Sequence, residues 1–142
     1  PEQGPLQILP GSHLEGIHNH YDEAGVWRGE IQPDVVSKLN LDKAIELCAP
    51  AGSITVHNYI TAHGSRPNLS NVGRPLLLYV LSAADAAPYT AQPIASKYEQ
   101  HIIRGNPASH IHHVEGRFRP PPDWSGGYTS IFEIQQLKKT AG

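Results

Sequence analysis

Two short segments that alternate like strands, joined by an Ala-Gly pair, most constrain the fold of this chain. Residues 42–50 (DKAIELCAP) and 53–60 (SITVHNYI) alternate apolar and polar side chains, and the second segment is rich in β-branched residues. The Ala-Gly pair at 51–52 is typical of a turn. The chain also has 13 Gly and 13 Pro among 142 residues, so turns are frequent and elements short. This pattern favours an all-β fold.

Other segments fit the same design. Further strands are predicted over residues 4–13 (broken by Pro-Gly), 74–84, 110–120 and 128–137, the last as a strand or a mixed end. The segment 74–84 (RPLLLYVLSAA) is nearly continuous apolar, which predicts a central strand buried on both faces.

The connections are less regular. Residues 14–40 have weak periodicity and read as a long variable insertion, with one helical turn at PDVVSKL, where Pro33 suits a first-turn position. Residues 85–107 read as a loop with a short helix over 95–103. We therefore predict a single domain, 1–142, built as a β-sandwich or barrel, in which 85–142 is a C-terminal extension.

Charge and composition exclude several classes of protein. The net charge is −2 and the chain has no basic run, which argues against nucleic acid as a partner. No apolar stretch approaches the roughly 18 residues of a membrane span. The single cysteine, Cys48, rules out an internal disulfide and suits a reducing, cytoplasmic setting. Cys48 could be a nucleophile, but a buried small apolar role is the commoner fate of such a residue.

The stretch TAHGSRPNLSNVGRP (61–75) holds the main candidate for a functional site. His63 precedes a small, polar, turn-rich run, and Arg74 stands at the start of the apolar segment. A neutral imidazole suits iron, zinc or copper, and a guanidinium binds a carboxylate through two parallel hydrogen bonds. On neighbouring antiparallel strands the two could hold a dicarboxylate in one cavity. Alternatively, His63 caps a turn and Arg74 is a solvated strand-edge residue.

Three linked motifs favour the first of these two interpretations. QGPLQILPGSH is followed, after the insertion, by AGSITVHNYITAHGSRPNLSNVGRPLLLYVL. In this order and spacing, residues 1–84 resemble the phytanoyl-CoA dioxygenase family. The resemblance implies a non-haem Fe(II), 2-oxoglutarate-dependent oxygenase on a double-stranded β-helix, the cupin-like jelly roll.

The resemblance implies a role for three residues. His63 corresponds to the distal histidine of the 2-His-1-carboxylate iron triad. Arg74 corresponds to the residue that pairs with the C5 carboxylate of 2-oxoglutarate, and Ser65 to the hydroxyl that bonds the same carboxylate. Three ligands on one face leave positions for the oxo acid and O₂. Asn68 and Ser70 are expected to stabilise the loop.

The chain departs from the family pattern in one respect. The family's first two iron ligands form a His-x-Asp/Glu motif upstream of the Gly-Pro-Leu strand, and here the sequence begins at that strand, without a methionine. We expect an N-terminally truncated jelly roll that lacks a complete metal site. His20 and Asp22 (HYD) have the right spacing to substitute but follow the Pro-Gly-Ser-His turn instead of preceding the strand.

Other histidines leave weaker alternatives. His110 and His112, in HIHHV, would share a strand face that could hold a metal, although a surface or interface role is the simpler reading. His13 could face the substrate or serve in a turn or helix cap.

The sequence thus predicts an enzyme of the Fe(II)/2-oxoglutarate class that hydroxylates a small organic substrate and releases succinate and CO₂. The rival hypothesis is a non-catalytic jelly-roll module that binds a small carboxylate or assembles. A homo-oligomer is expected if strand edges are exposed.

Overall fold

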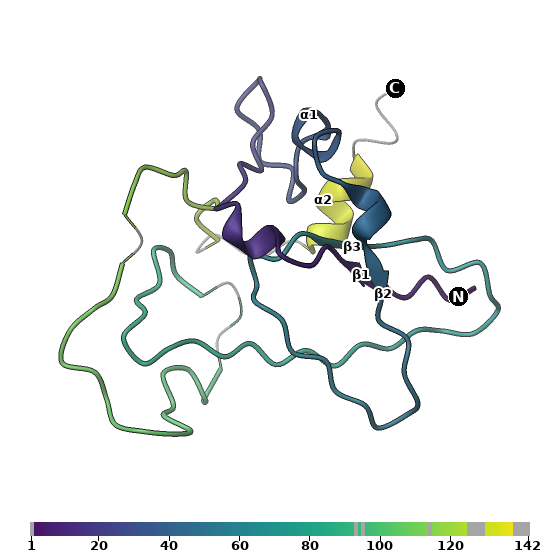
Figure 1. Ribbon diagram of the computed structural model, residues 1–142. Helices are drawn as coiled ribbons and strands as arrows, with labels where there is room; N and C mark the ends of the chain where they lie inside the picture. Colours follow the sequence, from purple (N-terminus) through teal and green to yellow (C-terminus); the bar gives the residue numbers. More distant parts are fainter. Residues whose placement is uncertain (1, 93, 95, 114, 125–129, 138–142) are drawn as a thin grey trace. The chain divides into compact units, whose positions relative to one another are not determined.

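The computed structural model describes residues 2–92, 94, 96–113, 115–124 and 130–137. By its internal contacts the chain divides into two units, Pro1–His18 with Pro33–Leu78 and Asn19–Gln32 with Tyr79–Gly142. Regular structure is sparse and long stretches run as loops (Figure 1). The expectation of a single domain stays a prediction.

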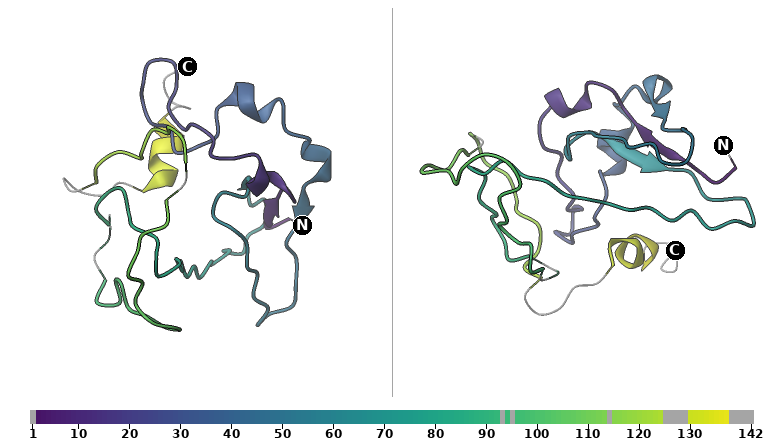
Figure 2. Two further views of the ribbon diagram at one scale, coloured as in Figure 1. Left: turned by 60° about the vertical axis from the view of Figure 1, so that its left-hand side comes forward. Right: turned by 90° about the horizontal axis from the view of Figure 1, so that it is seen from below.

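The first unit is organised by a small antiparallel sheet. Its strands β1 (Leu6–Ile8), β2 (Ile45–Glu46) and β3 (His63–Ser65) lie in the order β2-β1-β3. Figure 2 shows β3 beside β1 although more than fifty residues of chain separate them. The predicted strand over 4–13 is confirmed in β1, and the strand over 42–50 only as β2. The sheet and the few short helices give a β-rich arrangement.

The core of the first unit lies where β1 ends and β3 begins. Leu9 and Ala62 are the buried apolar side chains among the residues described, and Ser12 and Thr61 are the buried polar ones. Ser12 stands in a short 3-10 helix, η1 (Ser12–Leu14). Its hydroxyl donates to the Leu9 carbonyl at 2.7 Å and accepts from the Ala62 N–H at 2.8 Å. One hydroxyl therefore joins the exit of β1 to the entry of β3.

Short helices form at the end of the insertion and directly after it. Helix α1 (Pro33–Val36) begins at Pro33, which confirms the predicted helical turn. A second 3-10 turn, η2 (Leu41–Lys43), leads into β2. The predicted turn at Ala51–Gly52 also forms, with Gly52 at φ 90°, a backbone conformation that favours glycine.

Two predicted strands do not form. Residues 53–60 and 74–84 are unpaired loop and turn, and most of their apolar side chains are exposed: 93% for Val56 and 88% for Val80. Apolar and β-branched residues indicate only that a segment suits a sheet. A strand also needs a neighbour for its N–H and C=O groups, and the described part of the chain pairs no strand with either segment. The prediction of a central strand buried on both faces is wrong.

The second unit contains a hairpin and a helix. Tyr21 pairs with Trp27 across an isolated antiparallel bridge, and the Trp27 ring contacts Trp124 edge-to-face at 5.3 Å between centroids. The Arg119 guanidinium stacks on the Tyr21 ring at 3.7 Å. These aromatic contacts tie residues of the insertion to residues 119–124.

Helix α2 (Ile131–Leu137) forms in the segment 128–137, which was predicted to be a last strand or a mixed end; residues 128 and 129 of that prediction lie outside the described residues. The Ser130 hydroxyl accepts from the Phe132 N–H at 3.3 Å, as expected of an N-cap. Gln135 of α2 donates to the Gly29 carbonyl at 2.8 Å. The predictions of a strand over 110–120 and a helix over 95–103 are also wrong within the described residues, which form loop and turn there.

Candidate functional site

Strand β3 presents His63 and Ser65 on one face of the sheet, because residues two apart on a strand point to the same side. Its pairing with β1 sets Ile8 opposite His63 and Leu6 opposite Ser65. Directly paired residues share a face, so the candidate iron ligand and the candidate carboxylate-binding hydroxyl lie next to two apolar side chains.

The opposite face of the same sheet carries polar and charged contacts around Glu46. Glu46 of β2 accepts a hydrogen bond from Gln7 at 3.2 Å and lies 3.7 Å from the Arg66 guanidinium. Arg66 follows β3 directly, yet it is engaged on the face away from His63 and Ser65. It is therefore an arginine close to the candidate site but outside it.

Arg74 reaches Ser65 from the loop that follows β3. Its Nη1 donates to the Ser65 hydroxyl at 3.3 Å. The structure brings these two predicted residues together, although Arg74 lies in a loop and not on a strand, so its expected place on a neighbouring antiparallel strand is wrong. Both side chains are exposed, and together they offer a guanidinium and a hydroxyl to one incoming carboxylate.

The loop between β3 and Arg74 is held by its own polar residues. Asn68 donates to the Val72 carbonyl at 2.8 Å and accepts from the N–H and the hydroxyl of Ser70 at 2.9 and 2.7 Å. The Leu69 N–H also donates to the Glu2 carbonyl at 2.8 Å. The expected loop-stabilising role of Asn68 and Ser70 is confirmed.

His63 has one ring nitrogen committed to the backbone. Its Nδ1 lies 2.7 Å from the Thr61 carbonyl oxygen. A carbonyl can only accept, so Nδ1 carries the proton in the neutral ring and Nε2 keeps its lone pair. Metal-ligating histidines commonly hold their second ring nitrogen in this way, and His63 fits one position of an iron centre.

A cavity of about 380 Å³ opens beside His63 and includes a histidine that the sequence did not single out. Its lining residues are Ile8, Pro10, Gly11, His13, His57, Asn58 and Thr61. The His57 and His63 ring centroids are 5.7 Å apart, whereas neither His63 nor Arg74 lines the cavity. His57 was missed because it stood in a segment predicted to be a plain strand.

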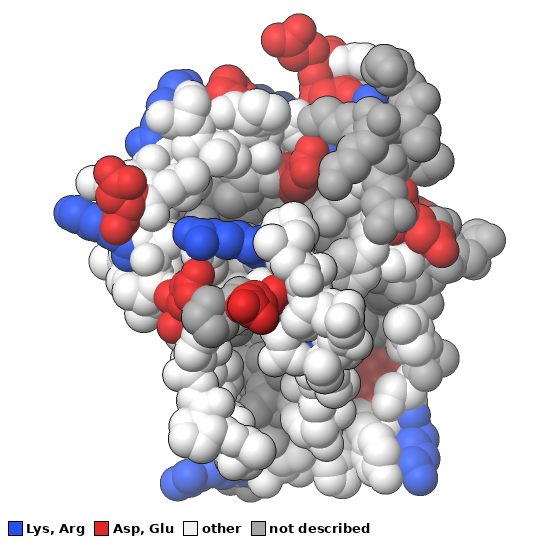
Figure 3. Space-filling model, turned by 90° about the vertical axis from the view of Figure 1, so that its right-hand side faces the viewer, with Lys and Arg blue, Asp and Glu red and all other residues white. Residues whose placement is uncertain are grey.

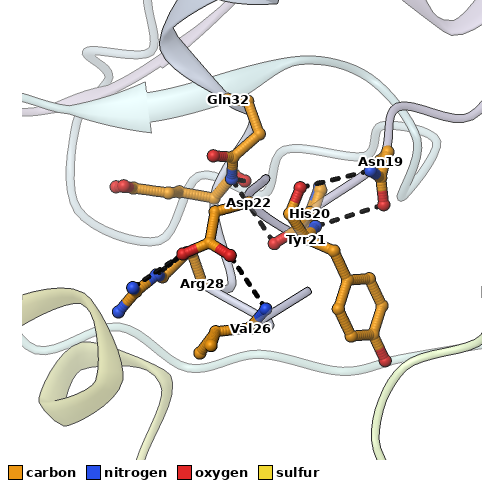
Figure 4. Close-up of polar contacts among 8 residues, drawn as sticks. Asn19, His20, Tyr21, Asp22, Val26, Arg28 and Gln32 are labelled. Carbon is orange, nitrogen blue, oxygen red and sulfur yellow. Dashed lines mark hydrogen bonds and ion pairs between the residues drawn. The ribbon is translucent and has the colours of Figure 1, made fainter. Parts of the chain in front are cut away.

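Asp22 serves the hairpin of the second unit (Figure 4). One carboxylate oxygen accepts from the Val26 N–H at 2.8 Å, and the other accepts from Arg28 Nε at 2.7 Å, with Arg28 Nη2 at 2.6 Å. The Val26 N–H foremost, and then Arg28, holds the pKa of Asp22 below its usual value. His20 and Asp22 belong to the second unit and His63 to the first.

Other candidates from the sequence are placed as follows. His110 contacts the Ser109 hydroxyl at 2.8 Å and His112 lies in a loop, not on a shared strand. Cys48 is exposed, so the expectation that it is buried is wrong. Within the described residues, no three His, Cys, Asp or Glu side chains group closely enough to hold a metal ion.

The surface and helices bear on possible partners. On the face drawn in Figure 3, basic side chains lie beside acidic ones, and the absence of a nucleic-acid partner stays a prediction. None of the helices that the described residues form has the length and apolar character to cross a bilayer.

Comparison with known proteins adds independent evidence. Residues 1–76, which include His63, Ser65 and Arg74, match the model of the phytanoyl-CoA dioxygenase family. The chain is 33% identical over 141 residues to a Stutzerimonas stutzeri protein described as "Probable alpha-ketoglutarate-dependent hypophosphite dioxygenase", covering 95% of this chain and 48% of the relative. It is 31% identical over 100 residues to the ectoine dioxygenase of Stutzerimonas stutzeri (strain A1501), covering 61% of this chain and 32% of the relative.

The chain thus spans about half the length, or less, of the curated relatives it matches. No solved structure gives a significant match. The family match covers more than half of the chain and contains every residue of the predicted site. The chain belongs to the phytanoyl-CoA dioxygenase family.

Proposed function

We propose that this chain forms part of an Fe(II)- and 2-oxoglutarate-dependent dioxygenase that hydroxylates a small organic substrate. The hydrogen bond between Arg74 and Ser65 is the observation that carries the proposal. One relative in this family is described as alpha-ketoglutarate-dependent. A guanidinium and a hydroxyl that lie together near a strand histidine are the groups expected to bind the C5 carboxylate of 2-oxoglutarate.

Arg74 and Ser65 are proposed to bind the C5 carboxylate of 2-oxoglutarate. Two charge-assisted hydrogen bonds from the guanidinium fix its plane, and the Ser65 hydroxyl adds a third donor. The loop held by Asn68 orients Arg74 before the cosubstrate arrives, which lowers the ordering cost of binding.

His63 is proposed to be one ligand of the iron, through Nε2. A facial triad needs two more protein ligands, and the described residues do not group three candidates. The iron, when bound, would activate O₂, one atom of which enters succinate as 2-oxoglutarate loses CO₂ while the other hydroxylates the substrate. Arg74 and Ser65 bind and orient the cosubstrate, and they set the distance between its C5 carboxylate and His63.

The complete protein is further proposed to fold as a double-stranded β-helix in one domain, with the sheet β2-β1-β3 as part of it. The exposed apolar segment 76–81 suits a strand that pairs within that fold or with a second copy.

The relatives are named for small molecules, hypophosphite and ectoine, which supports a small-molecule substrate. A cytoplasmic location is proposed from the cysteine usage. The rival reading as a non-catalytic module gains no support from these relatives.

The test is succinate formation from 2-oxoglutarate by the protein that contains this chain, with Fe(II) added. We expect release that requires iron and is abolished in His63→Ala. The matched control is His110→Ala, which removes a histidine outside the site. Equal succinate release by wild type and His63→Ala would contradict the proposal.

A further inference from the structure

Residues 2–4, directly before β1, lie against the loop 66–73, directly before Arg74. The outermost pair that β1 forms with β3 at this end is Leu6 with Ser65. Because the two strands are antiparallel, the residues before β1 and those after β3 leave the sheet at the same end. Residues 2–4 are therefore placed to act on the loop from which Arg74 reaches Ser65. We call this segment the strap.

The strap meets the start of the loop at Gly4. Gly4 is buried and has φ 62°, a backbone conformation that favours glycine. A Cβ added there would overlap the carbonyl oxygens of Arg66 and Pro67. The absence of a side chain at Gly4 thus lets the backbone of the strap approach the backbone of the loop.

Two hydrogen bonds continue this contact along the loop. The Leu69 N–H donates to the Glu2 carbonyl at 2.8 Å, and the Gln3 side-chain amide donates to the Gly73 carbonyl at 3.5 Å. Gly73 is the residue before Arg74, so Gln3 holds the backbone at the point where the arginine side chain departs. The strap therefore contacts the loop near its start, its middle and its end.

Hydrogen bonds within the loop serve a different purpose from those of the strap. The Asn68 amide and the Ser70 hydroxyl both donate to the Val72 carbonyl, at 2.8 and 3.2 Å. These bonds join residues 68–72 to one another and set the shape of the turn. The bonds from the strap join that turn to a segment continuous with β1, and so set its place beside the sheet.

We propose that the strap positions Arg74 for the cosubstrate and that Gln3 is a positioning residue, acting through the Gly73 backbone without touching the cosubstrate. The inference rests on the proposed function, in which Arg74 binds the C5 carboxylate of 2-oxoglutarate. A long side chain loses rotamer freedom when it is ordered. A backbone that already directs Arg74 toward Ser65 lowers this cost of binding. The strap thus favours the distal carboxylate and leaves the oxo-acid end of the cosubstrate unaffected.

The first measurement follows Arg74 itself, by NMR relaxation of its ¹⁵Nε in the protein that contains this chain, without metal or cosubstrate. Gln3→Met keeps the length of the side chain and lacks the donor, and we expect it to make the Arg74 side chain more mobile. The matched control is Gln7→Met, which removes an exposed glutamine of β1 whose amide donates to Glu46 at 3.2 Å. This control should leave the Arg74 relaxation unchanged.

The second measurement compares two oxo acids by calorimetric titration with Fe(II) under anaerobic conditions. 2-Oxoglutarate has the distal carboxylate, and 2-oxobutyrate lacks it. We expect Gln3→Met to bind 2-oxoglutarate about threefold more weakly, as for one exposed hydrogen bond, and to bind 2-oxobutyrate like wild type. A general loss of folded protein would lower the binding of both oxo acids alike.

The outcomes separate this inference from the proposed function. Equal Arg74 mobility in wild type and Gln3→Met, or an equal loss of both oxo acids, would overturn the positioning role while 2-oxoglutarate binding by wild type still stands. If Arg74 becomes mobile in Gln3→Met but wild type does not bind 2-oxoglutarate, the proposed function fails and the positioning of Arg74 by the strap is supported.

Discussion

Nη1 of Arg74 donates a hydrogen bond to the hydroxyl of Ser65, nine residues earlier, at 3.3 Å. Ser65 shares its face of β3 with His63, so the contact places a cation on the same side of the sheet as the candidate metal ligand. The loop between Ser65 and Arg74 holds its shape through Asn68. The position of the Arg74 side chain is therefore set by the conformation of this loop, because Arg74 does not lie on a strand.

Replacing Arg74 by Ala should weaken 2-oxoglutarate binding by about 2 kcal/mol, or roughly 30-fold, since hydrogen bonds to charged groups contribute about 1.5–3 kcal/mol. Calorimetric titration measures it. The matched control is Arg66→Ala, which removes an arginine engaged with Glu46 on the other face and should leave the affinity unchanged. Equal losses in the two variants would mean that general positive charge, and not Arg74, attracts the cosubstrate.

Replacing Gly4 by Ala should destabilise the first unit and displace the loop before Arg74. Gly4 is buried at φ 62°, and a Cβ there would lie 2.1 Å from the Arg66 carbonyl oxygen and 2.8 Å from that of Pro67. The backbone conformation alone costs about 1–2 kcal/mol for a non-glycine residue, and the clash adds to it.

Gly52→Ala is the matched control for Gly4→Ala. Gly52 has φ 90° with no atom within 4 Å of the added Cβ, so it reports the backbone cost alone. Urea unfolding should show a clearly larger loss of stability for Gly4→Ala. If the two variants lose the same free energy of unfolding, the close approach at Gly4 is not a constraint in solution.

Replacing Ser12 by Ala should lower the free energy of unfolding by about 1–3 kcal/mol, because the Ala62 N–H loses its acceptor in a buried place. Thermal or urea unfolding measures the loss. Ser37→Ala is the control: the Ser37 hydroxyl donates to the Asp34 carbonyl at an exposed site, and its removal should cost under about 0.5 kcal/mol. A Ser12→Ala loss no larger than that of Ser37→Ala would show that water reaches the Ala62 N–H.

Local signals predicted local structure well. Pro33 starts α1 where a first-turn proline is expected, Gly52 closes its turn, and Asn68 organises its loop through bonds to residues two and four positions away. Each of these depends on interactions within a few residues, which the sequence displays directly. The capping pattern at Ser130 and Glu133 is of the same kind and marks the start of α2.

Long-range structure was predicted poorly for a physical reason. The segment around Val80 has strand-like composition, but pairing depends on a partner that composition does not name. The Arg74–Ser65 contact was anticipated only through the family resemblance. His57 entered the candidate site because Ser12 draws two distant segments together, and nothing near His57 in the sequence signals that. Turns, caps and loop hydrogen bonds can therefore be predicted from neighbouring residues. The contacts between distant segments depend on packing, which the local sequence does not specify.

The hairpin around Asp22 should loosen as the pH falls through the lowered pKa of its carboxylate. The Val26 N–H first, and then Arg28, stabilises the ionised form. A group whose pKa is lower in the folded state contributes stability above its unfolded value, about 3.9, and loses it as protonation proceeds below that value. Amide hydrogen exchange at Val26 should therefore be slow near neutral pH and lose protection below about pH 4, relative to exchange of an unstructured peptide.

Asp22→Asn keeps the size of the side chain but removes the titrating group, so its Val26 protection should be lower at neutral pH and show no such transition. A wild-type Val26 that keeps its protection when Asp22 is protonated would mean that the Tyr21–Trp27 pairing, and not the carboxylate, holds the hairpin closed.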